Sequence, residues 1–389
     1  MSRREKLLAV LAVIFAGAAV AGALVGVPAG AAPVASAEVV VDQQAGADDA
    51  DQLDSALQVW ADAPLGAKPT IVFSPNNVLD LAQRNAAPGQ PYQLQDGMHF
   101  QCLASIGREF KTNCKVRVQG GNALFRLRQG SNVRTRDISM VGIEWEGAAA
   151  THFFEPVTDF AAGPILSYSD LADSGWSGFN TVMQVRVLGV RLERFYVNGS
   201  DHTPFKWAGS DSLMADGFLD SPNLDDTEYL LWFPHLSHTE IRKVFVTCDG
   251  PTCLRVDGSY RLHINGGDYE SQGVPRAGAG AAVLINGGFV DLEQVATQNT
   301  NCNLAGAGRS TDRGRITING GVVRVMNLQV GNRNAGCAVP PSASGVVDVQ
   351  VNGGKALVYY GLHQDGTDIS IRKLTSSVVV KSDLPVTIG

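Results

Sequence analysis

The chain has 389 residues, of which 44% are hydrophobic and 18% are charged, and its formal net charge is −7 at neutral pH. This length is sufficient to bury a large core. The acidic balance argues against nucleic acid or an anionic membrane surface as the main partner, because both are themselves negatively charged.

The first 37 residues have the organisation of a secretory signal. Three of the first six residues are basic, an apolar segment follows over Leu7–Val27, and Ala35-Ser36-Ala37 supplies the small residues of a cleavage site. We therefore expect a mature protein that is secreted or held at the cell surface, with no membrane partner after cleavage. The alternative is an uncleaved N-terminal anchor, because the apolar segment is long enough to cross a bilayer.

Residues 38–68 are predicted to be an acidic linker that contains a cap helix. The segment Asp42–Asp51 is rich in aspartate and has no bulky apolar residue, which is typical of a solvated stretch. Leu53–Trp60 is expected to form a short helix over the first coil of the fold. A stack of coils needs such a cap, because its open end exposes core residues and unpaired strand edges.

From Thr70 onward the chain has the pattern of β-structure with few helical stretches. Apolar and polar residues alternate in Met183–Val187, Val190–Glu193 and Glu240–Val246, as expected for half-buried strands. Residues 69–389 are therefore predicted to form one β domain.

The last third of the chain repeats a hydrophobic residue followed by Asn-Gly-Gly four times. The phrases begin at Ile264, Ile285, Ile318 and Val351, so their starts are 21, 33 and 33 residues apart. Such a period is typical of a solenoid, in which one structural unit stacks on the next. Asn and Gly tolerate the positive φ that a sharp corner between strands requires. We therefore predict parallel coils rather than hairpins, with the four asparagines stacked as a ladder.

Six cysteines remain after removal of the signal, and an even number in an exported chain implies disulfides. Two of them occupy equivalent long loops of the repeat, which predicts one bond between neighbouring coils, and the others are close in sequence. The expected pairs are Cys302 with Cys337, Cys248 with Cys253, and Cys102 with Cys114. No Cys-x-x-Cys is present, so no metal site is predicted.

The export signal, the coil-length repeat, the Asn-Gly corners and the strand runs together resemble the right-handed parallel β-helix proteins of the pectin-lyase-like superfamily, over roughly Thr70–Gly389. The resemblance implies an all-β fold: a single right-handed parallel β-helix with loop insertions and a capped N-terminal end. Many members are polysaccharide lyases or glycoside hydrolases, and others are surface proteins without known chemistry. Asp225-Asp226 matches one polygalacturonase element, but Gly-His-Gly is absent, so fold alone does not give the activity.

Regular alternation fades between Asn198 and His238, where charged and aromatic residues are dense. Loops longer than about 15 residues are usually functional or disordered, and the aromatic residues argue against disorder. We therefore predict an insertion at 198–238 that carries the functional site.

The side chains of this segment suit two chemistries on polysaccharides. Glycosidic hydrolysis usually needs a pair of carboxyl groups, whereas a lyase needs a base and a cation or metal that neutralises a uronate carboxylate. The candidate catalytic residues are Asp225, Asp226, Lys206, His202 and His235, and the candidate substrate-binding residues are Trp207, Tyr229 and Trp232. Glu228 and His238 are a further candidate acid and base.

Two functional hypotheses follow. The first is an exported enzyme acting on an acidic polysaccharide, a lyase before a hydrolase; if it is a lyase, calcium bound by Asp225, Asp226 and Glu228 is the expected cofactor. The second is a non-catalytic surface or matrix protein that presents a rigid rod and binds glycan. Neither hypothesis fixes the oligomeric state.

Overall fold

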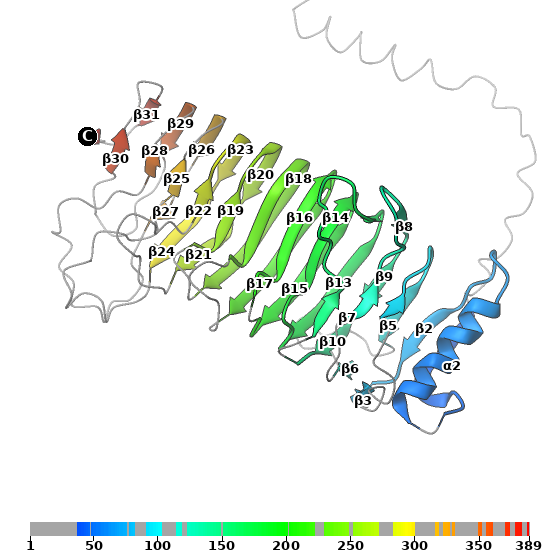
Figure 1. Cartoon of the computed structure of the whole chain (residues 1–389). Helices are drawn as coiled ribbons and strands as arrows, with labels where there is room; N and C mark the ends of the chain where they lie inside the picture. Colours follow the sequence, from blue (N-terminus) through cyan, green and yellow to red (C-terminus); the bar gives the residue numbers. More distant parts are fainter. Residues whose placement is uncertain are drawn as a thin grey trace, which may run out of the picture. The chain divides into compact units, whose positions relative to one another are not determined.

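The protein is an all-β parallel solenoid, as the sequence predicts. Ala37–Gly389 form one compact unit, and strands of successive coils pair in parallel along it (Figure 1). The computed structural model describes residues 37–46, 48–75, 78–81, 91–102, 114–118, 123–148, 151–200, 202–221, 229–248, 252–271 and 283–299, and after these the strands at 316–318, 322–326, 329–330, 349–351, 355–360, 370–373, 378–382 and 387–388.

A full coil has three sides, which we call faces A, B and C, and strand β18 (Leu231–Cys248) runs through all three. The backbone of β18 has positive φ at His238 and Lys243, where the strand turns from one face to the next. Its first part pairs with β16 in face A, its middle part with β20 in face B, and its last part with β21 in face C.

Faces A and C lie on either side of face B along the chain. Face A contains β8 (Arg134–Arg136), β12 (Ile165–Ser167), β14 (Met183–Leu188), β16 (Phe205–Ser210), β19 (Leu254–Val256), β22 (Val283–Ile285), β25 (Ile316–Ile318), β28 (Val349–Val351), β30 (Ser370–Lys373) and β32 (Thr387–Ile388). Face C contains β3 (Val78–Asp80), β6 (Cys114–Arg117), β10 (Ile143–Glu146), β21 (Asp268–Ser271), β24 (Ala296–Asn299) and β27 (Gln329–Val330).

Three longer strands bend from face B into face C, namely β13 (Asp170–Ser177), β15 (Arg191–Asn198) and β17 (Leu213–Ser221). The other strands of face B are β1 (Glu38–Val40), β2 (Thr70–Phe73), β5 (His99–Cys102), β9 (Ser139–Val141), β20 (Ser259–Asn265), β23 (Gly288–Glu293), β26 (Val322–Met326), β29 (Lys355–Tyr360) and β31 (Val378–Ser382). A separate small sheet contains β4 (Tyr92–Gln93), β7 (Ala123–Arg126) and β11 (His152–Phe154).

The corner between faces B and C recurs at the same position in successive coils. Asp173, Arg194, Asp216 and Lys243 have φ values of 51°, 49°, 53° and 50°, and the residues before them pair in register. Gly266 of the first Asn-Gly-Gly phrase occupies the same position, with φ of 69°. The left-handed region disfavours most side chains and is easiest for glycine and short polar residues, which Asp173, Asp216 and Gly266 supply, whereas Arg194 and Lys243 adopt it without such a side chain.

The four Asn-Gly-Gly phrases do not form a single column. Ile285 pairs with Ile318, and Ile318 with Val351, so three phrases follow the same column of face A. Ile264 pairs instead with Leu292, and its phrase turns the chain from face B to face C. The prediction of four stacked asparagines is therefore wrong for the first phrase, because its spacing of 21 residues separates two corners of one coil.

Alternate residues of the strands point inward and form one continuous core. In β14 every second side chain is buried. Near the N-terminal end the core is aromatic: the ring of Phe125 lies 5.4 Å from Phe100, 5.6 Å from Trp145 and 5.4 Å from Phe153, between centroids. Large buried aromatic rings contribute much of the stability of such a core. The pairing of the strands and the packing of the core therefore stabilise the same arrangement, because each coil buries its inward residues against those of the next coil.

Helix α2 (Asp49–Asp62) covers the N-terminal end, as the expected cap does, and is longer than predicted. The Asp48 carboxylate accepts the backbone N–H of Asp51 at 2.9 Å, which satisfies a free donor of the first turn. Segment 38–68 is not a linker, because β1 pairs with β2 and the 3-10 helix η1 (Val41–Gln43) follows it. The buried side chains of α2 are Ala50, Leu53, Ala56 and Trp60. No helix in the described part of the chain is both long and apolar enough to cross a membrane.

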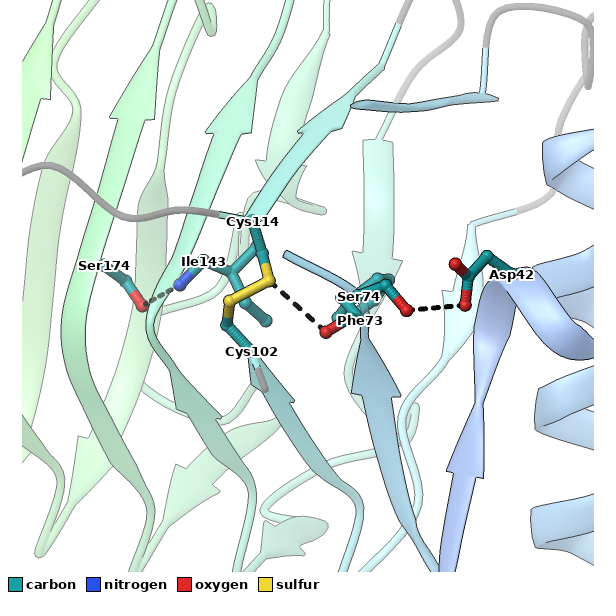
Figure 2. Close-up of a disulfide and its surroundings, with 7 residues drawn as sticks. All are labelled: Asp42, Phe73, Ser74, Cys102, Cys114, Ile143 and Ser174. Atoms are coloured by element: carbon teal, nitrogen blue, oxygen red, sulfur yellow. Dashed lines mark hydrogen bonds between the residues drawn. A yellow bond between two sulfur atoms is a disulfide. The ribbon is translucent and has the colours of Figure 1, made fainter. Parts of the chain in front are cut away.

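Two of the three predicted disulfides are present. Cys102 of β5 is bonded to Cys114 of β6, and the Cys114 sulfur lies 3.3 Å from the carbonyl oxygen of Phe73 (Figure 2). Cys248, at the end of β18, is bonded to Cys253, just before β19. The third predicted pair, Cys302 with Cys337, lies outside the described residues.

The segment 198–238 is not an insertion where the structure describes it. Strand β16 pairs with β14, and β17 pairs with β15, both in the register of the coils. Alternation is obscured in the sequence because small residues replace apolar ones: Gly209 has a φ of 141°, and a Cβ there would collide with the carbonyl oxygen of Val187. Residues 201 and 222–228, which include the candidates Asp225, Asp226 and Glu228, lie outside the described residues.

Candidate functional site

The outer surface of face A carries a row of polar and aromatic side chains from four successive coils. Gln184, Lys206, Trp232 and Arg255 pair in register across β14, β16, β18 and β19. Each of them is followed by a buried residue, as the alternation of a strand requires. These four side chains therefore lie next to one another on the outside of the solenoid.

The indole of Trp232 lies between two cations. The Lys206 ammonium is 3.7 Å from the centroid of the Trp232 ring, and the Arg255 guanidinium is 4.8 Å from it. Because Lys206 belongs to the preceding coil and Arg255 to the following one, the two charges flank the ring along the solenoid axis. A cation over an indole face is stabilised by about 0.5 to 2 kcal/mol. Lys206 also lies 4.7 Å from the ring of Phe160.

The Asp257 carboxylate holds Trp232 and Arg255, the last two residues of this row, in place. It accepts hydrogen bonds from Arg255 Nε at 2.7 Å, from Trp232 Nε1 at 2.7 Å and from the amide of Asn286 at 2.7 Å. Burial alone would raise the pKa of Asp257, but the hydrogen bonds from Arg255, Asn286 and Trp232 outweigh it, and the pKa lies below its ordinary value. Arg255 also donates to the Tyr229 hydroxyl at 3.0 Å. Asp257 is thus an ionised anchor rather than a proton acceptor.

Further cations towards the N-terminus lie in the neighbouring outward row, two residues further along the strands. Arg186 of β14 donates to the carbonyl oxygen of Gly163 and to Asn132, both at 2.7 Å. Arg134 of β8 is exposed and reaches Arg186 in register through the intervening strand β12. We call the four residues Arg134, Arg186, Lys206 and Arg255 the cationic strip of face A.

His235 lies on the same face, one strand from Lys206. It is exposed, and its backbone pairs with Ala208, two positions along from Lys206. Its Nδ1 lies 2.6 Å from the carbonyl oxygen of Gly258. A carbonyl can only accept, so Nδ1 must carry the proton, and in the neutral ring Nε2 keeps its lone pair. The ring therefore presents a basic nitrogen at the surface.

The structure brings together four of the eight residues proposed from the sequence for catalysis or binding: Lys206, Tyr229, Trp232 and His235. Trp207 does not join them. It was expected to stack on a sugar, but it is 0% exposed and packs in the core beside Phe205, with ring centroids 6.2 Å apart. Its neighbour Lys206 points outward, so strand alternation sends Trp207 inward.

His202 also lies apart from the strip. It precedes β16, where its backbone N–H donates to the carbonyl oxygen of Asn180 at 3.2 Å. Burial, and next the charge of His202, lower the pKa of His152. The remaining candidates, Asp225 and Asp226, fall outside the described residues.

Four residues of the site were not singled out in the sequence: Arg134, Arg186, Arg255 and Asp257. The alternation Arg255-Val256-Asp257 is a visible signal, because it places both charged residues on one side of a strand. The sequence alone does not give the register in which this strand, β19, pairs with β18 and places Arg255 beside Trp232. Within the described residues, no group of three histidine, cysteine, aspartate or glutamate side chains is placed to hold a metal ion.

Comparison with known proteins gives a likeness in structure but none in sequence. No protein-family profile matches the chain, and no curated protein sequence matches it. Among solved structures, the chain is similar to the A-module of the mannuronan C-5 epimerase AlgE6 of Azotobacter vinelandii, with a TM-score of 0.47 and 11% sequence identity over 90% of this chain and 100% of that one.

Proposed function

We propose that this protein is an exported β-solenoid that binds an acidic polysaccharide along face A. The observation that carries the proposal is the cationic strip, in which Lys206 and Arg255 flank the ring of Trp232. The export signal and the two disulfides, which form in oxidising compartments, support a location outside the cell or on its surface. Membership of the pectin-lyase-like superfamily is part of the same proposal.

The spacing of the strip suits a chain of repeated anions. Adjacent parallel strands are about 4.8 Å apart, so Lys206 and Arg255, with one strand between them, are separated by roughly 10 Å along the solenoid axis. A polyuronate presents carboxylates at regular intervals, so a single chain laid along the axis meets several cations in succession. Among the described residues, the Asp257 carboxylate pairs with Arg255 at 2.7 Å and holds this guanidinium beside the ring of Trp232.

The binding test uses polygalacturonate and alginate as probes, with the mature protein and affinity electrophoresis or calorimetry. We expect Lys206→Gln and Arg134→Gln each to weaken binding about fivefold, corresponding to roughly 1 kcal/mol for an exposed charge. Binding should also weaken steeply as salt is raised, because exposed charges are screened.

Lys243→Gln is the matched control, since Lys243 is exposed at a corner outside face A. An equal loss of affinity in Lys243→Gln would show that net charge alone governs binding and would contradict a site on face A. Failure of both polyuronates to bind the unaltered protein would also overturn the proposal.

A second candidate function, polysaccharide lyase, is favoured by the position of His235 and Lys206 on neighbouring strands of one face. A lyase removes the C5 proton of a uronate with a base while a cation stabilises the carboxylate. His235 offers a basic Nε2, and Lys206 offers the cation one strand away. Calcium would supply further neutralisation if Asp225, Asp226 and Glu228 bind it.

The lyase is tested by following new absorbance from the unsaturated uronate product, with and without calcium. The expected result is turnover that His235→Ala abolishes while polyuronate binding persists. Binding without any product on polygalacturonate or alginate would reject the lyase and leave the binding function intact.

A further inference from the structure

A second distinctive surface lies on face C, a different side of the coils from the cationic strip of face A. Tyr196 of β15, Phe218 of β17 and Phe245 of β18 pair in register on three successive coils. They form a single outward row along the solenoid axis, with about 4.8 Å between neighbouring strands. We call these three residues the aromatic row of face C.

The rings of the aromatic row are at least partly exposed to solvent, unlike the aromatic rings of the core. Phe218 is 42% exposed and Phe245 is 48% exposed, whereas inward aromatics such as Trp176 are fully buried. Tyr196 is half-buried because its ring covers Gly175 of the preceding coil, where a Cβ would collide with it. Glycine at 175 thus leaves space for the Tyr196 ring beside the backbone of the preceding coil.

The row beside the rings supplies hydrogen-bonding groups. Ser177, Asn198, Asp220 and Thr247 pair in register, two residues after the aromatic row. Hydroxyl and amide groups both donate and accept, which suits ligands that carry many hydroxyl groups. Apolar ring surface next to such groups matches a pyranose, whose faces carry C–H groups and whose edges carry hydroxyls.

The charge of face C distinguishes its ligand from that of face A. Among the side chains described on this face, the exposed or half-exposed charges are the cations Lys115 and Arg117 and the carboxylates Asp80, Glu144, Glu146 and Asp220. Lys115 is already paired with Glu146 at 2.7 Å. Four described carboxylates against two described cations leave this face without the positive excess that would attract an anionic polymer or an anionic membrane.

The geometry points to a neutral polysaccharide as the ligand of face C, held along the solenoid axis with sugar rings against Tyr196, Phe218 and Phe245. Exposed, contiguous apolar surface on a folded protein commonly marks an interaction site, and the flanking polar row favours a hydroxylated chain over a second protein copy. This site stands apart from the polyuronate site of face A, and the two can fail separately.

The test uses affinity electrophoresis of the mature protein in gels containing hydroxyethyl cellulose, xyloglucan, laminarin or galactomannan. We expect at least one of these neutral polymers to retard the protein. Phe218→Ala and Phe245→Ala should each weaken that retardation about tenfold, as expected for a central aromatic contact. Phe218→Tyr should restore most of it, because the ring is retained. Binding to polygalacturonate should be unchanged in all three variants.

Phe289→Ala is the matched control, because Phe289 is 38% exposed on face B. An equal loss in this control would overturn the assignment to face C. No retardation by any of the four polymers would also overturn it. If Phe218→Ala and Phe245→Ala instead change the oligomeric state seen by light scattering, the row is a self-association surface and the glycan proposal is wrong.

Discussion

Faces A and C are built by the same coils and have the same kind of interior, yet their outer surfaces differ in charge and chemistry. Inward residues such as Trp207 in face A and Trp176 in face C are 0% exposed. Outward residues are cations around Trp232 on face A, and on face C they are aromatic rings beside a mostly uncharged polar row. The inward residues of both faces thus serve the same core. The outward residues do not pack in the core, so their chemistry can differ from face to face and suit different ligands.

The difference teaches that a β-solenoid decouples stability from binding. Stability depends on inward rows that stack in register, whereas each outer row repeats with the strand spacing and can match a periodic polymer. Variants of inward residues should therefore damage both faces together, and variants of outward residues should damage one face alone.

The largest expected effect is in the shared core. Trp207→Ala should lower the free energy of unfolding by about 3–5 kcal/mol, because a large buried ring is removed and the surrounding coils refill only part of the cavity. Urea unfolding followed by circular dichroism measures it. The outward Phe245→Ala should cost about 1 kcal/mol or less. Similar losses in the two variants would contradict the division between inward and outward rows.

A smaller loss is expected at the anchor of face A. Asp257→Asn should cost about 1–3 kcal/mol, because Arg255 and Trp232 lose a charged acceptor. The folded pKa of Asp257 is below its ordinary value of 3.8, so the ionised carboxylate stabilises the fold above pH 3.8, and this contribution is lost as the pH falls below that value. The two proteins should therefore converge in stability in acid. A difference that stays constant from pH 7 to strongly acidic conditions would contradict this account.

The sharpest comparison of the two faces is a crossed binding experiment. Lys206→Gln should weaken polygalacturonate binding about fivefold and leave the neutral polymer unaffected, and Phe218→Ala should do the reverse by about tenfold. Affinity electrophoresis in paired gels measures both. If either variant weakens both ligands equally, the faces form one site rather than two.

The smallest effect is expected at a corner that belongs to neither face. Arg194 donates two hydrogen bonds to Asp173, at 2.6 and 2.7 Å, and this exposed pairing raises the pKa of Arg194. Asp173→Asn keeps a residue that tolerates a φ of 51°. We expect a loss of less than about 1 kcal/mol, measured by thermal unfolding and reduced at high salt. A loss as large as that of Trp207→Ala would show that the ion pair, rather than backbone geometry, fixes the corner.

Much of the fold was accessible from the sequence. The spacing of Ile285, Ile318 and Val351 predicts stacked coils, and these residues do pair in register. The two local disulfides are predictable because the partners are close in sequence, 12 residues apart for Cys102 and Cys114 and 5 residues apart for Cys248 and Cys253. The phrase at Ile264 was misplaced, because sequence spacing does not distinguish two corners of one coil from equivalent corners of two.

The site was accessible only in part. The sequence proposes Lys206 as the cation that neutralises a uronate and proposes Trp207 and Trp232 as rings that stack on sugars, yet Trp207 is buried. Composition could not separate them, since the break in alternation around Gly209 hid the strand. Arg255 was missed because it is 23 residues from Trp232 in sequence and meets it only through the pairing of β18 with β19.

By itself, the sequence determined that this chain is an all-β parallel solenoid with a capped start, because turn residues, alternation and repeat length are local properties of the chain. Only the tertiary structure decided which residues become neighbours on a face. That depends on the register between coils of unequal length, and a shift of one residue moves every side chain to the other side of the sheet. The cationic strip of face A and the aromatic row of face C are both products of that register.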